Sequence, residues 1–247
     1  ELVAGDLDTR IAGVSTDTRT ITPGSLFVAL TGENSDGHKF LADALSKGAV
    51  GVVVSRKVEA KCLAIRVPDT LLALGDIAAF YRSKFKPIIV GVTGSVGKTT
   101  TKEMIAAVAA AKGPVLKNEG NFNNEIGLPL SILSLRPEHR YAVLEMGMYA
   151  LGEIERLCTL GRPHVGIVTN VGPVHLSRLG SIENIQRAKS ELPRALPSAD
   201  DGGVAILNWD DARVKAMAEW TQARVFRYGL TPAADLWADE LQSMGME

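Results

Sequence analysis

The chain has 247 residues, of which 46% are hydrophobic and 22% charged, so it can build buried cores and is not a disordered segment. Its formal net charge is −1, with both signs mixed along the chain, which removes the electrostatic argument for a nucleic-acid-binding protein. No apolar run is long enough to cross a bilayer, and the first residues carry no secretion signal. Cys62 and Cys158 are isolated, without metal-ligand spacing. We therefore expect a cytoplasmic protein with reduced cysteines and no membrane insertion.

Strand-like and helix-like segments alternate in the first third of the chain, which indicates an α/β fold. The expected strands cover residues 25–30, 50–54 and 62–67, and the expected helices residues 37–48 and 70–85. Lys86-Pro87 then breaks the pattern. We therefore predict a first domain over residues 1–86 and a second over residues 87–247.

The most informative stretch of the chain begins at Ile88, where an apolar strand leads through a glycine turn into Lys98, Thr99 and a helix. Gly94 and Gly97 allow backbone N–H groups to face phosphate oxygens without an intervening Cβ. The Lys98 amine can reach β- and γ-phosphates, the Thr99 hydroxyl can ligand Mg²⁺, and the helix N-terminus favours the same anion. The stretch therefore predicts a nucleotide-binding loop.

This loop departs from the usual phosphate-binding pattern at one position. The first glycine of that pattern would fall at Val92, and Gly91 lies one residue too early. A surface turn is the alternative, but the strand before it and the helix after it argue against that. The predicted nucleotide-binding residues of the loop are Thr93, Gly94, Ser95, Val96, Gly97, Lys98, Thr99 and Thr100.

Continuous apolar runs continue through the second domain at residues 141–145, 165–169 and 204–207, and they are typical of strands buried on both faces of a parallel sheet. Helices are expected at residues 181–196 and 211–220, with Ser181 and Asp211 as N-caps. The predicted architecture is a small N-terminal α/β domain followed by a P-loop domain with a mostly parallel sheet flanked by helices.

Two residues near the expected sheet edge could carry chemistry, and a third lies within an expected helix. Glu145 ends a strand where parallel sheets place their ligands and could hold Mg²⁺, or it could be an ordinary surface glutamate. His175 follows the strand at residues 165–169 and could ligand a metal or bind phosphate, although a loop histidine is more often simply solvated. Lys189 looks like any lysine on a helix face, and chemistry alone does not select it.

Four polar clusters remain open to both a ligand-binding and a structural interpretation. Asparagine and glycine favour turns in any case, a polar triplet before a helix can cap it, and an aspartate that enters a helix can be an N-cap. The clusters are Ser15, Thr16, Asp17, Thr18 and Arg19; Asp36, Gly37 and His38; Asn121, Asn123 and Asn124; and Asn208 and Asp211.

Together these segments resemble the Mur ligase family of peptidoglycan synthesis over nearly the whole chain. Residues 15–38 resemble the UDP-binding first domain of that family, and residues 93–99 resemble its ATP loop, in which the offset of Gly91 is normal. Leu144-Glu-Met-Gly, His175 and Ala188-Lys189 follow in the family's order. Residues 120–129 resemble the form typical of members that add D-alanyl-D-alanine.

The resemblance implies roles for individual residues. Thr99 and Glu145 would ligand a Mg²⁺ that bridges the β- and γ-phosphates of ATP. His175 and Lys189 would serve a second Mg²⁺, with Lys189 as a carbamate formed from CO₂. Asn208 and Asp211 would lie near the adenosine. The implied catalytic set is Lys98, Glu145, His175 and Lys189, and the clusters at residues 15–19, 36–38 and 121–124 would bind substrate.

The implied reaction is the ATP-dependent joining of D-alanyl-D-alanine to UDP-N-acetylmuramoyl-tripeptide through an acyl phosphate, by a monomer. The family has a third, C-terminal domain that these 247 residues do not include, so we expect the sequence to be the front part of a longer protein and to bind ligands without steady turnover. The alternatives are the sister ligase that adds the third amino acid, a non-catalytic nucleotide-binding module and an unrelated P-loop hydrolase.

Overall fold

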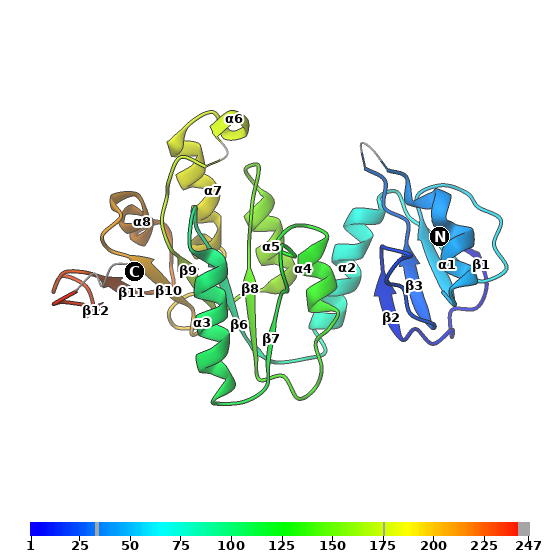
Figure 1. The fold of residues 1–247 in the computed structure, drawn as a ribbon, viewed down its shortest axis with the longest axis horizontal. Helices are drawn as coiled ribbons and strands as arrows, with labels where there is room; N and C mark the ends of the chain where they lie inside the picture. The colour runs from blue at the N-terminus through cyan, green and yellow to red at the C-terminus, as the bar shows by residue number, and fades with distance from the viewer. Residues whose placement is uncertain (33–34, 175, 242–247) are drawn as a thin grey trace, which may run out of the picture. The chain divides into compact units, whose positions relative to one another are not determined.

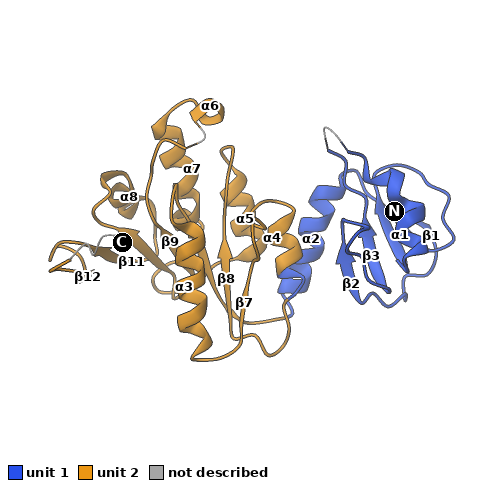
Figure 2. Cartoon of the chain, in the orientation of Figure 1, with its two compact units in different colours: residues 1–84, 132–134 blue, residues 85–131, 135–247 orange. Residues whose placement is uncertain are grey.

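The computed structural model describes residues 1–32, 35–174 and 176–241, and the chain divides into two compact units (Figure 1, Figure 2). Unit 1 comprises residues 1–84 and 132–134, and unit 2 comprises residues 85–131 and 135–247. The predicted boundary lies after residue 86, and the structural division falls after Lys84.

Unit 1 is built on a five-stranded sheet in the order β1-β5-β4-β3-β2. Its strands are β1 (Leu2–Ala4), β2 (Gly13–Ser15), β3 (Ser25–Val28), β4 (Gly51–Val54) and β5 (Leu63–Arg66). All neighbours pair in parallel except β1, which runs antiparallel to β5. The helices are η1 (Gly37–Phe40), α1 (Leu41–Ser46) and α2 (Thr70–Arg82). The alternation of strands and helices predicted for this part is confirmed, although β1 and β2 were not predicted.

Unit 2 contains a seven-stranded, fully parallel sheet in the order β12-β11-β10-β9-β6-β8-β7. Its strands are β6 (Ile88–Thr93), β7 (Val115–Lys117), β8 (Tyr141–Glu145), β9 (Val165–Val168), β10 (Val204–Asn208), β11 (Arg224–Gly229) and β12 (Leu236–Trp237). Its helices are α3 (Lys98–Ala110), α4 (Gly127–Ile132), α5 (Glu153–Gly161), α6 (Leu176–Leu179), α7 (Ile182–Arg194), α8 (Ala212–Ala216) and η2 (Met217–Trp220).

Helices cover both faces of the unit 2 sheet. Successive residues of β6 point to opposite faces. Val90 and Val92 pack with Ala106 of α3, whereas a Cβ at Gly91 would meet Leu192 of α7 at 2.9 Å. The central strand is therefore buried on both sides, which explains its continuous apolar sequence. The predicted α/β class, with a mostly parallel sheet flanked by helices, is confirmed. Within the described residues, no helix combines the length and apolar character needed to cross a membrane.

Phe27 of β3 has 1% of its surface exposed and belongs to the core of unit 1, so its replacement should be costly. We expect Phe27→Ala to lower the free energy of unfolding of unit 1 by about 3–5 kcal/mol, because it leaves a cavity in a packed interior. Phe80 of α2 is 66% exposed and gives the matched control, Phe80→Ala, whose loss should be about 1 kcal/mol or less. Urea unfolding measures both, and equal losses would contradict this description of the core.

Candidate active site

The site forms where β6 runs into α3 through the turn at residues 94–97. Gly94 has φ of 151° and Gly97 has φ of 84°, both in the region that favours glycine. A Cβ at Gly94 would lie 1.8 Å from the Thr169 hydroxyl oxygen, whereas a Cβ at Gly97 would meet nothing within 4 Å. Gly94 is thus required by the close approach of β9, and Gly97 by backbone conformation alone.

The segment after β9 fixes the conformation of this turn. The side chain of Asn170 accepts from the Val96 N–H at 3.0 Å and donates to the Val96 carbonyl at 2.9 Å. The Ser95 hydroxyl donates to the carbonyl of Gly172 and accepts from its N–H, and the Thr169 hydroxyl also donates to Val96. Sequence reasoning missed Thr169, Asn170 and Gly172, although their place after a strand adjacent to β6 is a usable signal.

Lys98 and Thr99 lie in the first turn of α3, and their side chains point in different directions. The Lys98 amine donates to the carbonyls of Gly94 and Ser95 at 2.9 and 3.3 Å, so the cation lies across the turn. The Thr99 hydroxyl donates to Glu145 Oε2 at 2.8 Å. Thr100 is exposed beside them. The Thr93 hydroxyl at the end of β6 is turned inward and donates to the carbonyl of Met146.

Glu145 presents a buried carboxylate at the end of β8, with only 2% of the residue exposed. Its oxygens accept from two neutral donors, the Thr99 hydroxyl and the Asn123 amide, both at 2.8 Å. The ion pairs of the described residues involve other carboxylates, and none of them includes Glu145. A buried carboxylate without a counter-charge is unfavourable unless a cation joins it, so this arrangement fits a divalent metal ion with oxygen ligands.

Lys189 of α7 lines a cavity beside the turn and is only 3% exposed. Burial, together with the nearby positive charge of Lys98, lowers the pKa of the Lys189 amine to about 7. A substantial fraction of this amine is therefore neutral and nucleophilic at neutral pH. The cavity is lined by Gly94, Lys98, Asn123, Asn124, Gly147, Met148, Tyr149, Glu153 and Lys189. His175, predicted to join this group, lies outside the described residues.

The asparagines of the loop between β7 and α4, which we call the asparagine loop, make different contacts. Asn123 reaches Glu145 through its side chain and accepts the Gly147 N–H through its carbonyl at 2.8 Å. The Asn124 side chain accepts from the N–H groups of Ile126 and Gly127 and so caps α4. Asn123 and Asn124 border the cavity, whereas Asn121 is exposed and is not among the lining residues.

Asn208 and Asp211, predicted to lie near an adenosine, hydrogen bond to the segment that supports the turn. The Asn208 amide donates to the Thr169 carbonyl at 2.8 Å. Asp211 caps α8 with one oxygen and accepts the Val171 N–H with the other at 2.7 Å. Both side chains therefore stabilise the strand ends behind the turn, and their contact with a nucleotide stays a prediction.

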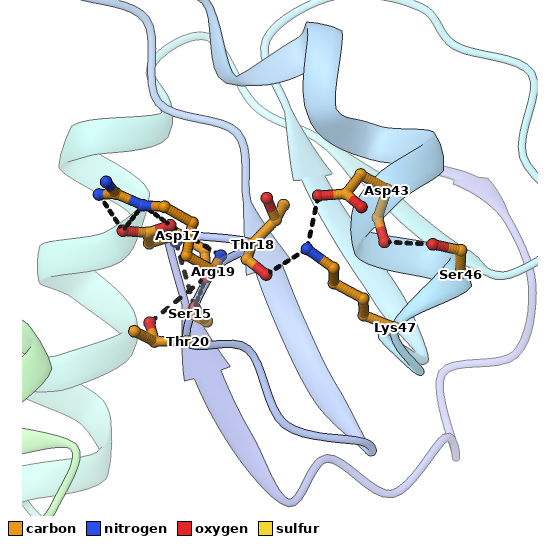
Figure 3. Close-up of polar contacts among 8 residues, drawn as sticks. All are labelled: Ser15, Asp17, Thr18, Arg19, Thr20, Asp43, Ser46 and Lys47. Carbon is orange, nitrogen blue, oxygen red and sulfur yellow. Dashed lines mark hydrogen bonds and ion pairs between the residues drawn. The ribbon is translucent and has the colours of Figure 1, made fainter.

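The cluster at residues 15–19 forms a polar turn in unit 1 (Figure 3). Asp17 holds Arg19 through a bidentate pair, and this guanidinium lowers the pKa of Asp17 to about 2. The Ser15 hydroxyl bonds to the backbone of Asp17, and Lys47 donates to the Thr18 carbonyl at 3.0 Å. Thr16 is half-buried in the same turn. The Arg19 side chain is 85% exposed and is the member most open to a ligand.

The cluster at Asp36-Gly-His38 is built into the fold. The His38 side chain, 2% exposed, places Nδ1 2.7 Å from Asp36 and accepts the Ser55 N–H through Nε2 at 3.0 Å, so Nδ1 carries the proton. Asp36 also caps η1 and pairs with Arg56. A Cβ at Gly37 would meet the Leu30 carbonyl oxygen at 2.7 Å. The structure thus explains these residues through packing, and a substrate role for them stays a prediction.

Comparison with known families identifies the chain at this point. A family model described as the Mur ligase middle domain matches residues 92–245, and one described as Mur ligase family, catalytic domain, matches residues 10–82. The chain belongs to the Mur ligase family. The P-loop, Glu145 and Lys189 all lie within the region matched by the middle domain of Mur ligases.

Several curated Mur ligases are similar to this chain. UDP-N-acetylmuramoyl-tripeptide–D-alanyl-D-alanine ligase from Synechocystis sp. is 45% identical over 90% of the chain and 49% of the relative. The ligase of the same name from Escherichia coli is 41% identical over 85% of the chain and 47% of the relative. The chain therefore spans about half the length of the curated relatives it matches.

Solved Mur ligase structures share the fold. A MurF structure from Acinetobacter baumannii has a TM-score of 0.87 and 36% identity, covering 94% of this chain and 51% of that one. MurF from Thermotoga maritima in complex with ADP has a TM-score of 0.81 and 32% identity, covering 91% of this chain and 52% of that one.

The two turn glycines give a matched pair for testing the geometry of the loop. Gly97→Ala should cost about 1–2 kcal/mol of stability, because it places a Cβ at positive φ in open space. Gly94→Ala should cost about 1–3 kcal/mol more, because its Cβ must also displace Thr169. Urea unfolding of both variants measures the difference, and a Gly97→Ala loss equal to or above that of Gly94→Ala would refute the described packing.

Proposed function

We propose that this chain supplies the substrate-binding and nucleotide-binding parts of a ligase that joins D-alanyl-D-alanine to UDP-N-acetylmuramoyl-tripeptide with MgATP. The observation that carries the proposal is the uncompensated Glu145 carboxylate, which accepts from Thr99 in the first turn of α3 and from Asn123, a residue that lines the same cavity as the buried Lys189. The names of relatives at 45% and 41% identity support the choice of substrates, and the ADP complex of a solved relative supports the nucleotide.

In the proposed reaction ATP supplies a transferable phosphoryl group. The N–H groups of the turn and the positive end of α3 bind its phosphates, and Lys98 exchanges the carbonyls of Gly94 and Ser95 for phosphate oxygens. Glu145 and Thr99 would hold Mg²⁺, which would neutralise charge on the phosphates. The substrate carboxylate attacks the γ-phosphate and releases ADP, which gives an acyl phosphate. The amine of D-alanyl-D-alanine then attacks the acyl carbon, releases inorganic phosphate and loses a proton. The chain's residues thus position the groups and neutralise charge, as phosphoryl transfer requires.

Lys189 has the properties needed for carbamate formation. A neutral amine adds to CO₂ and releases one proton, which converts a cationic side chain into an anionic ligand. Its lowered pKa supplies the neutral amine, and its burial beside Lys98 gives the new negative charge a favourable neighbour. In this proposal, His175 and the Lys189 carbamate would both be ligands of a second Mg²⁺.

Carbamate formation should be selective for Lys189 and dependent on pH. Burial lowers the pKa of this amine to about 7, so the neutral form dominates above pH 7 and declines as the pH falls through 7. With ¹³C-labelled bicarbonate at pH 8, ¹³C NMR should show one carbamate carbonyl signal that weakens below pH 7. The matched control is Lys189→Met, which should lack the signal. A signal that persists in this variant would assign the carbamate to another lysine.

Substrate preference tests the proposed function directly. We expect calorimetric titration of this chain to show UDP-N-acetylmuramoyl-tripeptide binding at least about tenfold more tightly than the dipeptide form, a difference of ~1.4 kcal/mol. Tripeptides ending in lysine and in diaminopimelate are both titrated, since either can occupy the third stem position.

The other outcomes of this titration distinguish the alternatives. An equal or reversed preference would favour the sister ligase that adds the third amino acid. MgATP binding without binding of either UDP substrate would favour a nucleotide-binding module or a P-loop hydrolase, and ATP hydrolysis by the chain separates those two.

A further inference from the structure

Asn118 follows β7 and is fully buried, with 0% of its surface exposed. Its side-chain amide pairs with the backbone of Glu145: the Glu145 N–H donates to Oδ1 at 2.8 Å, and Nδ2 donates to the Glu145 carbonyl at 3.0 Å. One side chain thus satisfies both backbone groups of the residue whose carboxylate forms the proposed cation site. This pairing fixes the end of β8, from which that carboxylate projects.

The same amide also fixes the asparagine loop. Nδ2 of Asn118 donates to the carbonyl of Phe122 at 2.8 Å. Phe122 directly precedes Asn123, whose amide donates to Glu145 Oε1 at 2.8 Å. Asn118 therefore positions both the carboxylate and one of the two donors that orient it.

The third element around the carboxylate reaches Asn118 through a buried lysine. Lys102 of α3, 1% exposed, donates to the Asn118 carbonyl at 2.6 Å and lies 3.2 Å from Glu103. One turn earlier, α3 carries Thr99, which donates to Glu145 Oε2. Strand β8, the asparagine loop and helix α3 thus all make contact with Asn118.

We propose that Asn118 is the positioning residue of the Glu145 cation site, setting the carboxylate in place relative to Thr99 and Asn123. It does not touch the ligand, because it is fully buried behind the strand end. The inference rests on the proposed function, in which this site binds Mg²⁺ together with a nucleotide. Substitution of a residue that orients a metal ligand commonly lowers metal affinity by about 10–100-fold.

Asn118→Asp is the sharpest test, because it keeps the shape of the side chain and removes its two donated hydrogen bonds. A carboxylate oxygen then faces the carbonyls of Glu145 and Phe122. All three groups are acceptors, so no hydrogen bond can form between them. The added negative charge alone would attract Mg²⁺ more strongly, so weaker Mg²⁺ binding in this variant reports lost positioning and not charge.

The experiment measures the affinity of the complete chain for a non-hydrolysable ATP analogue, by calorimetry, in EDTA and across a Mg²⁺ titration. We expect the Mg²⁺ concentration for half-maximal effect to rise about tenfold or more in Asn118→Asp, while the affinity in EDTA changes by a smaller factor. The control Leu160→Ala removes a buried side chain of α5 and should lower stability without moving the Mg²⁺ midpoint.

Lys102→Met is a second variant, which removes the hydrogen bond between α3 and the Asn118 carbonyl. It should raise the Mg²⁺ midpoint by a smaller factor than Asn118→Asp does. If Asn118→Asp shows no cooperative unfolding and so does not fold, the midpoint of Lys102→Met tests the inference. A wild-type midpoint in whichever variant folds would overturn the inference. A wild-type chain whose nucleotide binding does not respond to Mg²⁺ would instead overturn the proposed function.

Discussion

The buried carboxylate of Glu145 is the constraint on which the rest of the site depends. Desolvating an ionised carboxylate costs several kcal/mol, and in this chain two neutral donors orient the group without neutralising it. Three elements surround this charge: strand β8, the first turn of α3 and a loop hydrogen bonded to the strand end. A fold that keeps such a charge in place supports the proposed site, in which Mg²⁺ would join the carboxylate together with the phosphates of ATP.

Hydrogen bonds from the segment after β9 also fix the conformation of the phosphate-binding turn. Thr169 and Asn170 hold the turn. Asn208 at the end of β10 donates to the Thr169 carbonyl, and Asp211, the N-cap of α8, accepts from the N–H of the neighbouring Val171. These hydrogen bonds run across adjacent strand ends, so the protein's own groups hold the turn in this conformation. Preformed donors need no reorganisation when charge moves, which is the main electrostatic advantage of an enzyme site over water.

Patterns within short stretches of the sequence predicted several elements of the fold. The β6–α3 unit, the buried strands and the N-caps Ser181 and Asp211 follow from glycine placement, apolar runs and capping chemistry, and the structure confirms them. Strands such as β2 and β7 have three residues each, too few for periodicity to show. The role of Asn118 depends on a partner 27 residues away, which no local pattern can reveal.

The two polar clusters of unit 1 show why motif residues and ligand contacts need separate arguments. Asp36 and Ser55 hydrogen bond to both ring nitrogens of His38, so this side chain stabilises the fold. Arg19 is exposed, yet it is paired with a carboxylate whose pKa of about 2 keeps the pair charged at neutral pH. An anionic ligand at this turn would therefore compete with Asp17 for the guanidinium, and a ligand of the Ser15 hydroxyl would compete with the backbone of Asp17. Ser15 and Arg19 are thus both paired within the fold, so a ligand contact by either residue needs evidence of its own.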